Sequence, residues 1–314
     1  MSEGRFKKIA LAAALALGSS PANAGEFRAD RGGRPIFSAT LNGQQESCLF
    51  GSGANAAVVS EGLARRLNLS ITGREQLTTA GQTEANYARI ETVEVDGVQQ
   101  ENVRTIVLAQ HQGLTGVECI LGTNMLTDGN SGGKLTLNFG TSQYQMQGGG
   151  NCETGRGRHC VEGESRISPT APERRLPFVR VRINGVEALA LIDTGSATTR
   201  VNPALAERLR NPGMVRRGVT FRDLPANVQT PSSTEMVQMP SIAIGETQIE
   251  RVAAAVESDL PLFRQEDGTL VPGLIIGTRE LSQFESISID FTNPTRPVIE
   301  FVERPDRVQV AERE

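Results

Sequence analysis

Apolar and polar residues alternate over short stretches along most of the chain, and turn-forming residues separate these stretches. The alternation has the two-residue period of a half-buried strand, as in residues 135–139 and 287–291. Asn42-Gly43 and Asn184-Gly185 are strong signals for tight hairpin turns. The pattern predicts an all-β chain, with apolar residues at helical spacing only in two short segments, 63–67 and 205–209.

The same succession of segments occurs twice. The copies align at 35–53 with 177–195, at 63–67 with 205–209, at 119–123 with 274–278 and at 135–139 with 287–291. The first two matches have an offset of 142 (177 − 35) and the third one of 155 (274 − 119), so the second copy contains additional residues before its later strands. Four matches in one order indicate an internal duplication.

Composition between and around the copies suggests the domain boundaries. We expect a signal peptide at 1–24, a first lobe at 25–147, a linker at 148–176, a second lobe at 177–303 and a charged tail at 304–314. The linker is rich in Gly, Ser, Pro and charge, and the tail contains few apolar residues.

The N-terminal segment has the features of a cleavable signal peptide. Basic residues precede an apolar run at 9–17, and a small-x-small cleavage site follows at 22–24. The run is far shorter than the ~20 residues that cross a bilayer. We therefore expect a soluble periplasmic or secreted protein without a membrane span.

Charge and cysteine content narrow the function classes. The net charge of −4 makes nucleic acid an unfavourable partner. The only histidines, His111 and His159, lack the pattern of a Ser/His or Cys/His catalytic set. Cys152, His159 and Cys160 could supply three zinc ligands, but a disulfide between the two cysteines suits an exported chain better. We expect no cofactor and no metal.

An apolar strand at 189–192 runs directly into Asp193-Thr194-Gly195-Ser196. On its own this turn is equally compatible with a capped surface turn. About 80 residues later the chain has the apolar pair and glycine Ile275-Ile276-Gly277.

This combination resembles one lobe of the pepsin/retropepsin clan of aspartic proteases, over nearly all of the second copy. The resemblance implies two tandem retropepsin-like β-barrel lobes with one short helix each, and a flap within 221–236. It assigns roles around one turn: Asp193 as catalytic acid, Thr194 as a brace between paired turns, Gly195 as the tight bend, Ser196 as a hydrogen-bonding neighbour of the carboxylate, and Ile275, Ile276 and Gly277 as the strand beside it.

The first copy departs from the family pattern, because Gly51-Ser52-Gly53 stands where the second copy has Asp193-Thr194-Gly195. Two adjacent carboxylates share one proton, so one acts as base while the other acts as acid, and a single carboxylate loses this division of roles. Gly51 therefore marks a degenerate site. Pairing of two chains through their second copies, as in retropepsins, would restore two carboxylates.

Cys48 and Cys119 align with Ala190 and Leu274, whose strands are neighbours in the family fold. The resemblance thus implies a Cys48–Cys119 disulfide, with two buried free thiols as the alternative. Helix arginines such as Arg66 and Arg208 are expected to be solvated.

The leading hypothesis is an exported aspartic endopeptidase that cleaves an extended polypeptide through Asp193, with a second Asp193 supplied by a partner chain in a homodimer. The alternative is a peptide-binding or scaffolding protein that keeps the protease fold with weak or no catalysis. In a third arrangement the two copies of one chain close on each other as a monomer.

Overall fold

The computed structural model describes residues 24–77, 83–108, 116–127, 133–168, 171–210, 215–216, 235–258, 260–265 and 267–306. Nearly all of the expected signal peptide, residues 221–234 of the expected flap and most of the charged tail lie outside these residues. In the described part, strands predominate and helices are short, as the sequence pattern predicts.

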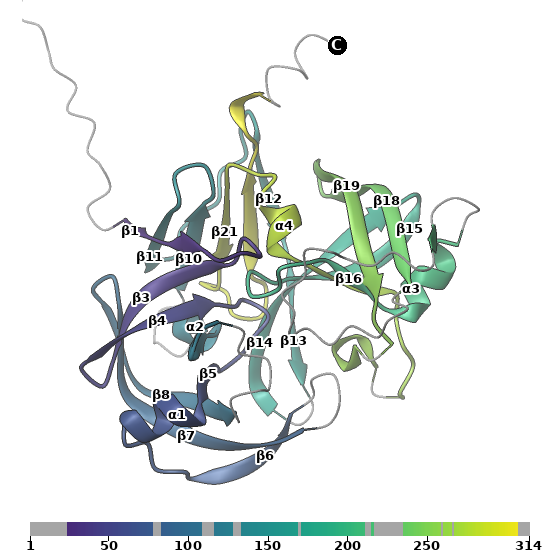
Figure 1. Cartoon of the computed structure of the whole chain (residues 1–314). Coiled ribbons are helices and arrows are strands. Elements are labelled where there is room, and N and C mark those ends of the chain that lie inside the picture. Colours follow the sequence, from purple (N-terminus) through teal and green to yellow (C-terminus); the bar gives the residue numbers. More distant parts are fainter. Residues whose placement is uncertain are drawn as a thin grey trace, which may run out of the picture.

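The first copy forms a closed β-barrel (Figure 1). Its ring consists, in order, of β3 (Pro35–Leu41), β4 (Gln44–Phe50), β9 (Cys119–Leu121), β5 (Ala57–Ser60), β8 (Val98–Leu108) and β7 (Thr83–Val95). Pairing of β3 with β7 closes the ring. The strands β2 (Arg28–Ala29) and β6 (Gly73–Leu77) extend the sheet, and the helices are α1 (Glu61–Arg66) and α2 (Asn124–Thr127).

The second copy repeats this barrel. Its ring consists of β14 (Ala171–Ile183), β15 (Val186–Ile192), β20 (Gly273–Ile276), β16 (Arg200–Val201), β19 (Thr247–Val256) and β18 (Met236–Ile244), and it closes through β14 and β18. The strands β13 (Glu164–Ser168) and β17 (Val215–Arg216) extend it. Its helices are α3 (Pro203–Arg208), the 3-10 turn η1 (Pro261–Phe263) and α4 (Thr278–Leu281).

Local residue chemistry explains why the two copies fold alike. Asn42 and Gly43 have φ angles of 47° and 79°, and Asn184 and Gly185 have 48° and 80°. Asparagine and glycine tolerate this left-handed region, which is what a two-residue hairpin turn requires. The predicted hairpins are therefore present at both positions.

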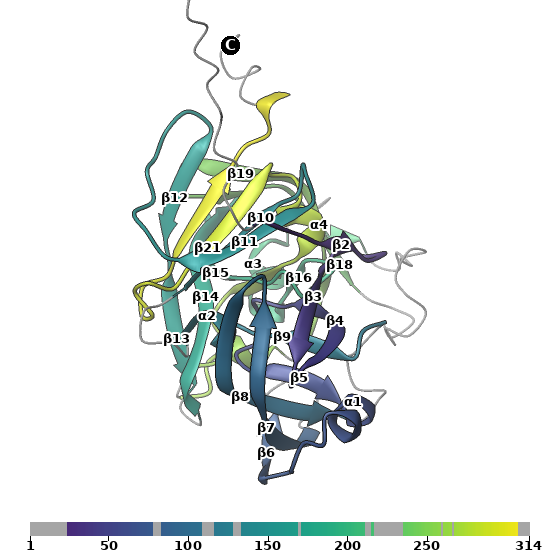
Figure 2. The same cartoon turned by 90° about the vertical axis from the view of Figure 1, so that its left-hand side faces the viewer.

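A six-stranded antiparallel sheet joins the barrels (Figure 2). Its order is β1 (Gly25–Glu26), β11 (Gln143–Gly148), β10 (Gly133–Asn138), β21 (Ser286–Asp290), β22 (Val298–Val302) and β12 (Arg158–Glu162). The matching strands of the copies pair here, with Leu135 opposite Ile289 and Leu137 opposite Ile287. These four side chains are buried in one core cluster that extends into both barrels.

The segment 148–176, expected to be a linker, is largely structured. It contains β12, which pairs with β22, and β13, which pairs with the early part of β14. The polar composition did not reveal these strands, because tertiary pairing supplies their hydrogen-bond partners in the absence of a hydrophobic period.

Candidate active site

Two turns meet between the lobes. Gly51-Ser52-Gly53 follows β4 of the first copy, and Asp193-Thr194-Gly195 follows β15 of the second. A Cβ atom added to Gly195 would lie 2.9 Å from the Cα atom of Gly51. The backbones therefore approach as closely as only glycine permits.

Reciprocal hydrogen bonds lock the two turns together. The Thr194 hydroxyl donates to the Phe50 carbonyl at 2.8 Å and accepts from the Ser52 N–H at 3.1 Å. The Ser52 hydroxyl donates to the Ile192 carbonyl at 2.7 Å and accepts from the Thr194 N–H at 3.0 Å. Both side chains are fully buried. Thr194 thus makes the bracing contacts that the resemblance implies, and Ser52 performs the same role from the degenerate copy.

The Asp193 carboxylate lies at the centre of this arrangement and is half-buried. Its Oδ1 atom accepts hydrogen bonds from the N–H groups of Gly195, at 2.8 Å, and Gly53, at 3.0 Å. A Cβ atom on Gly53 would lie 2.4 Å from Oδ2 of Asp193, so glycine at 53 makes room for the carboxylate. Among the described residues no hydrogen bond reaches Oδ2, which leaves this oxygen for proton transfer.

Gly51 occupies the position that corresponds to Asp193. The Gly51 N–H donates to the Leu121 carbonyl at 3.0 Å, just as the Asp193 N–H donates to the Ile276 carbonyl at 3.0 Å. A Cβ atom on Gly51 would lie 3.1 Å from Cγ2 of Ile120. The first turn therefore keeps its backbone path and lacks only the carboxylate, so this closed single chain places one carboxylate where a dyad has two.

The expected supporting strand lies beside the turn. β20 runs parallel to β15, with Ile275 opposite Leu191 and Ile276 opposite Ile192. A Cβ atom on Gly277 would lie 2.6 Å from the carbonyl carbon of Thr198, so glycine lets the strand pass close to the chain that follows the turn.

The Ser196 hydroxyl forms its hydrogen bond within the active turn's own segment. It donates to the Thr198 carbonyl at 2.9 Å, and no hydrogen bond joins it to the Asp193 carboxylate among the described residues. Oδ1 of Asp193 instead accepts hydrogen bonds from two backbone N–H groups.

Glu280 is a buried carboxyl group behind the turn that sequence reasoning missed. It is 2 % exposed, and the Thr199 hydroxyl donates to its Oε2 atom at 2.6 Å. Burial raises the pKa of Glu280 above its ordinary value. Thr199 Oγ1 also accepts a hydrogen bond from the Gly277 N–H, so this carboxyl group supports the chain next to the active turn.

The N-terminal part of each copy contacts the other copy, which the sequence also did not reveal. The Arg175 carbonyl accepts a hydrogen bond from the Thr123 hydroxyl at 2.7 Å. On the other side, a Cβ atom on Gly32 would lie 2.6 Å from the Cβ atom of Ala197. Each lobe therefore contributes to the base of the other lobe's turn.

All four cysteines form disulfides. Cys48 and Cys119 are directly opposite in the parallel pair β4 and β9, three residues before the degenerate turn. Cys152 is bonded to Cys160, the middle residue of β12 at the edge of the central sheet. The zinc and free-thiol alternatives are thereby excluded.

His159 lies 3.2 Å from a carboxylate oxygen of Glu303, whereas His111 is outside the described residues.

No helix in the described part of the chain is long and apolar enough to cross a membrane.

Residues 37–128 match a family model described as gag-polyprotein putative aspartyl protease, and residues 179–278 match one described as Aspartyl protease. Each match covers the core of one copy. No curated protein matches the chain.

Proposed function

We propose that this chain, a tandem pair of retropepsin-like aspartyl protease repeats, is an exported endopeptidase of aspartic type with Asp193 as its catalytic carboxylate. The observation that carries the proposal is the support around that side chain. One oxygen is fixed by two N–H groups, the other is unoccupied by hydrogen bonds from described residues, and Gly53 leaves the space it needs. Two disulfides and a leader-like N-terminus support export.

The geometry suits general-base catalysis by one carboxylate. A water molecule between Asp193 and an extended polypeptide would attack the peptide carbonyl carbon while its proton passes to Oδ2. The same proton would then pass to the leaving nitrogen as the C–N bond breaks, which gives a carboxylate and an amine. The closed chain offers no second carboxyl group at Gly51 to protonate the carbonyl oxygen, so we expect slow hydrolysis.

A homodimer that pairs two second copies would supply the second carboxylate, as expected from the sequence. In the closed chain, however, the turn of the first copy occupies that place. Displacing it would break the four hydrogen bonds of Ser52 and Thr194. At roughly 0.5–1.5 kcal/mol net for each bond, this costs about 2–6 kcal/mol before any new contact forms. We therefore place the active form in the single chain.

Peptide binding without cleavage is the second candidate function, and Gly51 is the observation that favours it. A protein that only holds an extended polypeptide needs the two lobes and the groove but no dyad. The retained support around Asp193 favours hydrolysis over this candidate.

The test uses the purified mature protein. Its mass in solution is measured by light scattering, and cleavage of an unstructured polypeptide is compared with that by Asp193→Asn. The proposal predicts a monomer with slow cleavage that the substitution abolishes. Cleavage that survives the substitution would refute it, and binding without cleavage by both proteins would establish the second candidate.

A further inference from the structure

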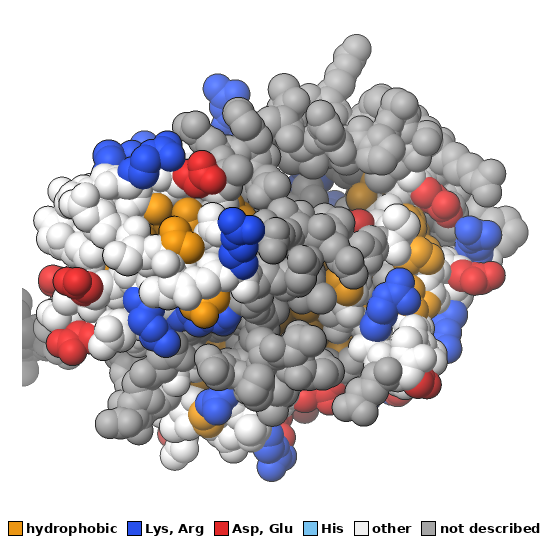
Figure 3. Space-filling view, turned by 90° about the horizontal axis from the view of Figure 1, so that it is seen from below, with side chains coloured by type: hydrophobic (Ala, Val, Ile, Leu, Met, Phe, Trp, Pro, Cys, Tyr) orange, Lys and Arg blue, Asp and Glu red, His pale blue; other side chains and the backbone are white. Residues whose placement is uncertain are grey.

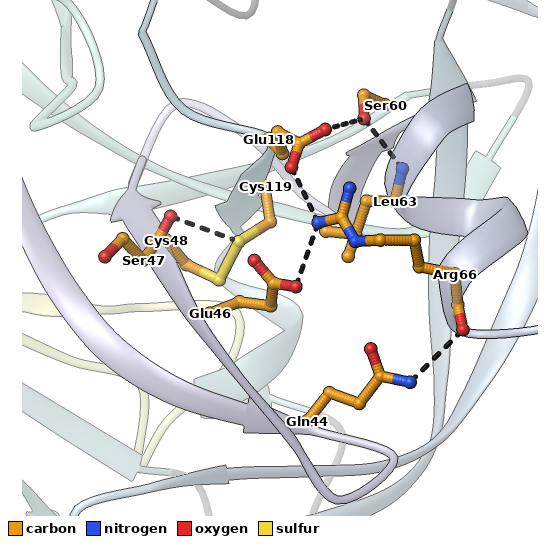
Figure 4. A network of polar contacts seen from close by, with 9 residues as sticks. All are labelled: Gln44, Glu46, Ser47, Cys48, Ser60, Leu63, Arg66, Glu118 and Cys119. Atoms are coloured by element: carbon orange, nitrogen blue, oxygen red, sulfur yellow. Dashed lines mark hydrogen bonds and ion pairs between the residues drawn. A yellow bond between two sulfur atoms is a disulfide. The ribbon is translucent and has the colours of Figure 1, made fainter.

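Arg66, at the end of α1, holds two carboxylates of the first lobe together (Figure 4). Its Nη2 atom lies 2.9 Å from Oε1 of Glu46 and 2.6 Å from Oε2 of Glu118. The guanidinium lowers the pKa of Glu118, whose other oxygen accepts a hydrogen bond from Ser60. Arg66 is exposed, as expected of a helix arginine, and it also has these two carboxylate partners, which the sequence pattern did not reveal.

The duplication places Arg208 at the same position in the second lobe, at the end of α3. The residues that correspond to Glu46 and Glu118 are Ala188 and Gly273. A side chain at 273 is excluded, because a Cβ atom there would lie 2.1 Å from the ring of Phe263. The second lobe thus keeps the arginine and has lost both of its internal carboxylate partners.

Phe263 lies in the connection between β19 and β20, which is longer than the corresponding connection between β8 and β9 in the first copy. It is fully buried in a small apolar cluster with Leu260, Phe178 and Leu189. The chain that follows it supplies Gln265, Val271 and Pro272 to the wall of a cleft of about 570 Å³. The connection between β19 and β20 therefore places an apolar side chain against Gly273, where the first lobe has Glu118, and forms one wall of an open cleft.

Three arginines line this cleft: Arg180, Arg182 and Arg208. Arg180 and Arg182 contact Glu164 and Glu187 at 3.3 Å in exposed positions, where ion pairs are weak and easily exchanged for other partners. Arg208 is exposed, and no ion pair or side-chain hydrogen bond engages it in the part of the chain that the structure describes. The cleft thus has one acidic side chain, Glu187, against three basic ones.

We propose that this cleft of the second lobe binds carboxylate groups, with Arg208 as the central contact. The first lobe, which has the same fold, already contains such an interaction, because the guanidinium of Arg66 contacts two carboxylates. A ligand's carboxylates would take the places that Glu46 and Glu118 fill around Arg66. Acidic side chains of a polypeptide and small free dicarboxylates both offer this group.

Electrostatic attraction of an anionic ligand would come from the arginines of the cleft and not from the protein as a whole. The chain carries a net charge of −4, so an anionic ligand gains nothing from the overall charge. On the face seen in Figure 3, basic and acidic side chains are interspersed and neither sign covers a broad area. Binding through the cleft should therefore depend on particular arginines.

The test measures fluorescence anisotropy of a labelled tetraglutamate peptide and of its tetraglutamine counterpart at low salt. We expect binding of the first alone, weakened up to about fivefold by Arg208→Ala, because an ion pair at an exposed position has only a modest effect on affinity. Ala188→Glu should weaken it likewise by supplying an internal partner. Arg65→Ala, on the exposed side of α1, is the matched control and should change nothing.

Glutarate competition identifies the source of the carboxylate. If glutarate displaces the peptide, the cleft also binds small free dicarboxylates. If glutarate does not displace it, the cleft binds the acidic side chains of a polypeptide. The inference is overturned if wild-type protein binds neither peptide, if both peptides bind equally, or if Arg208→Ala retains full affinity while its circular dichroism matches wild type. None of these outcomes depends on cleavage activity, so the inference and the proposed hydrolysis fail independently.

Discussion

The backbone N–H of Gly53 donates a 3.0 Å hydrogen bond to Oδ1 of Asp193, across the boundary between the two copies. A donor that belongs to the turn without a carboxylate thus serves the carboxylate of the other turn. The first copy supplies structure to the site while the second supplies the acid. This asymmetry leads to separate predictions for the two copies.

Gly53→Ala should displace the Asp193 carboxylate, because the new Cβ atom would lie 2.4 Å from Oδ2. We expect a loss of about 1–3 kcal/mol in the free energy of unfolding and the loss of most cleavage. Urea unfolding and a peptide-cleavage assay measure the two effects. Gly150→Ala is the matched control, since nothing lies within 4 Å of a Cβ atom there. Equal stability and activity of the two variants would contradict the prediction.

The hydroxyls of Ser52 and Thr194 should stabilise the chain as one unit. Ser52→Ala or Thr194→Val leaves buried polar groups of the opposite turn unpaired, at a cost of about 1–3 kcal/mol each. In the double variant the loss should be smaller than the sum, because both side chains belong to one hydrogen-bond network. Urea unfolding of the four proteins gives the coupling free energy. Strict additivity would show that the two turns are not locked together.

Glu280 should make stability depend on pH. Its pKa is raised in the folded state by burial, so the folded state binds its proton more tightly than the unfolded state. The stabilisation that the folded state gains from this bound proton is fully present below the ordinary pKa of 4.5. It is lost as the pH rises through the folded-state pKa of Glu280. Glu280→Gln should therefore gain stability relative to wild type as the pH increases above 4.5, and the difference should be smallest in acid. Chemical unfolding at several pH values measures it, and a difference that does not change with pH would contradict this.

The two disulfides should differ in their effect on stability because they close loops of different length. Cys48 and Cys119 are separated by 71 residues, and Cys152 and Cys160 by 8. Loop-closure entropy predicts a cost of about 4 kcal/mol for replacing the first pair by alanine and about 2–3 kcal/mol for the second. Urea unfolding of the two double variants compares them. A larger loss for the Cys152 pair would show that contacts around its loop outweigh chain entropy.

Local patterns were sufficient to predict the two hairpin turns at Asn42 and Asn184, the internal duplication and the turn that carries Asp193. Tertiary contacts decided the rest. Glu280 is buried against Thr199, and Arg66 contacts Glu46 and Glu118, and these partners are distant in the sequence.

The partner of the Asp193 turn could not be inferred from sequence for the same reason. A turn with Thr194 can pair with Ser52 of its own chain or with a second copy of itself, since both provide a hydroxyl at the same position. The order of strands in the central sheet, where β10 of the first copy pairs with β21 of the second, places the two turns of one chain together.

The most direct test of this account is the cleavage rate of Gly51→Asp measured as a function of pH, with Gly51→Asn as the control of equal size. The backbone at 51 follows the path of Asp193, and a Cβ atom there needs only a small shift of Ile120. A second carboxyl group adds general-acid catalysis, which typically contributes about 10²–10⁴-fold in rate. We predict that monomeric Gly51→Asp cleaves at least about a hundredfold faster than wild type, that Gly51→Asn does not, and that adding Asp193→Asn removes the gain. A folded, monomeric Gly51→Asp variant that cleaves no faster than wild type would contradict the account.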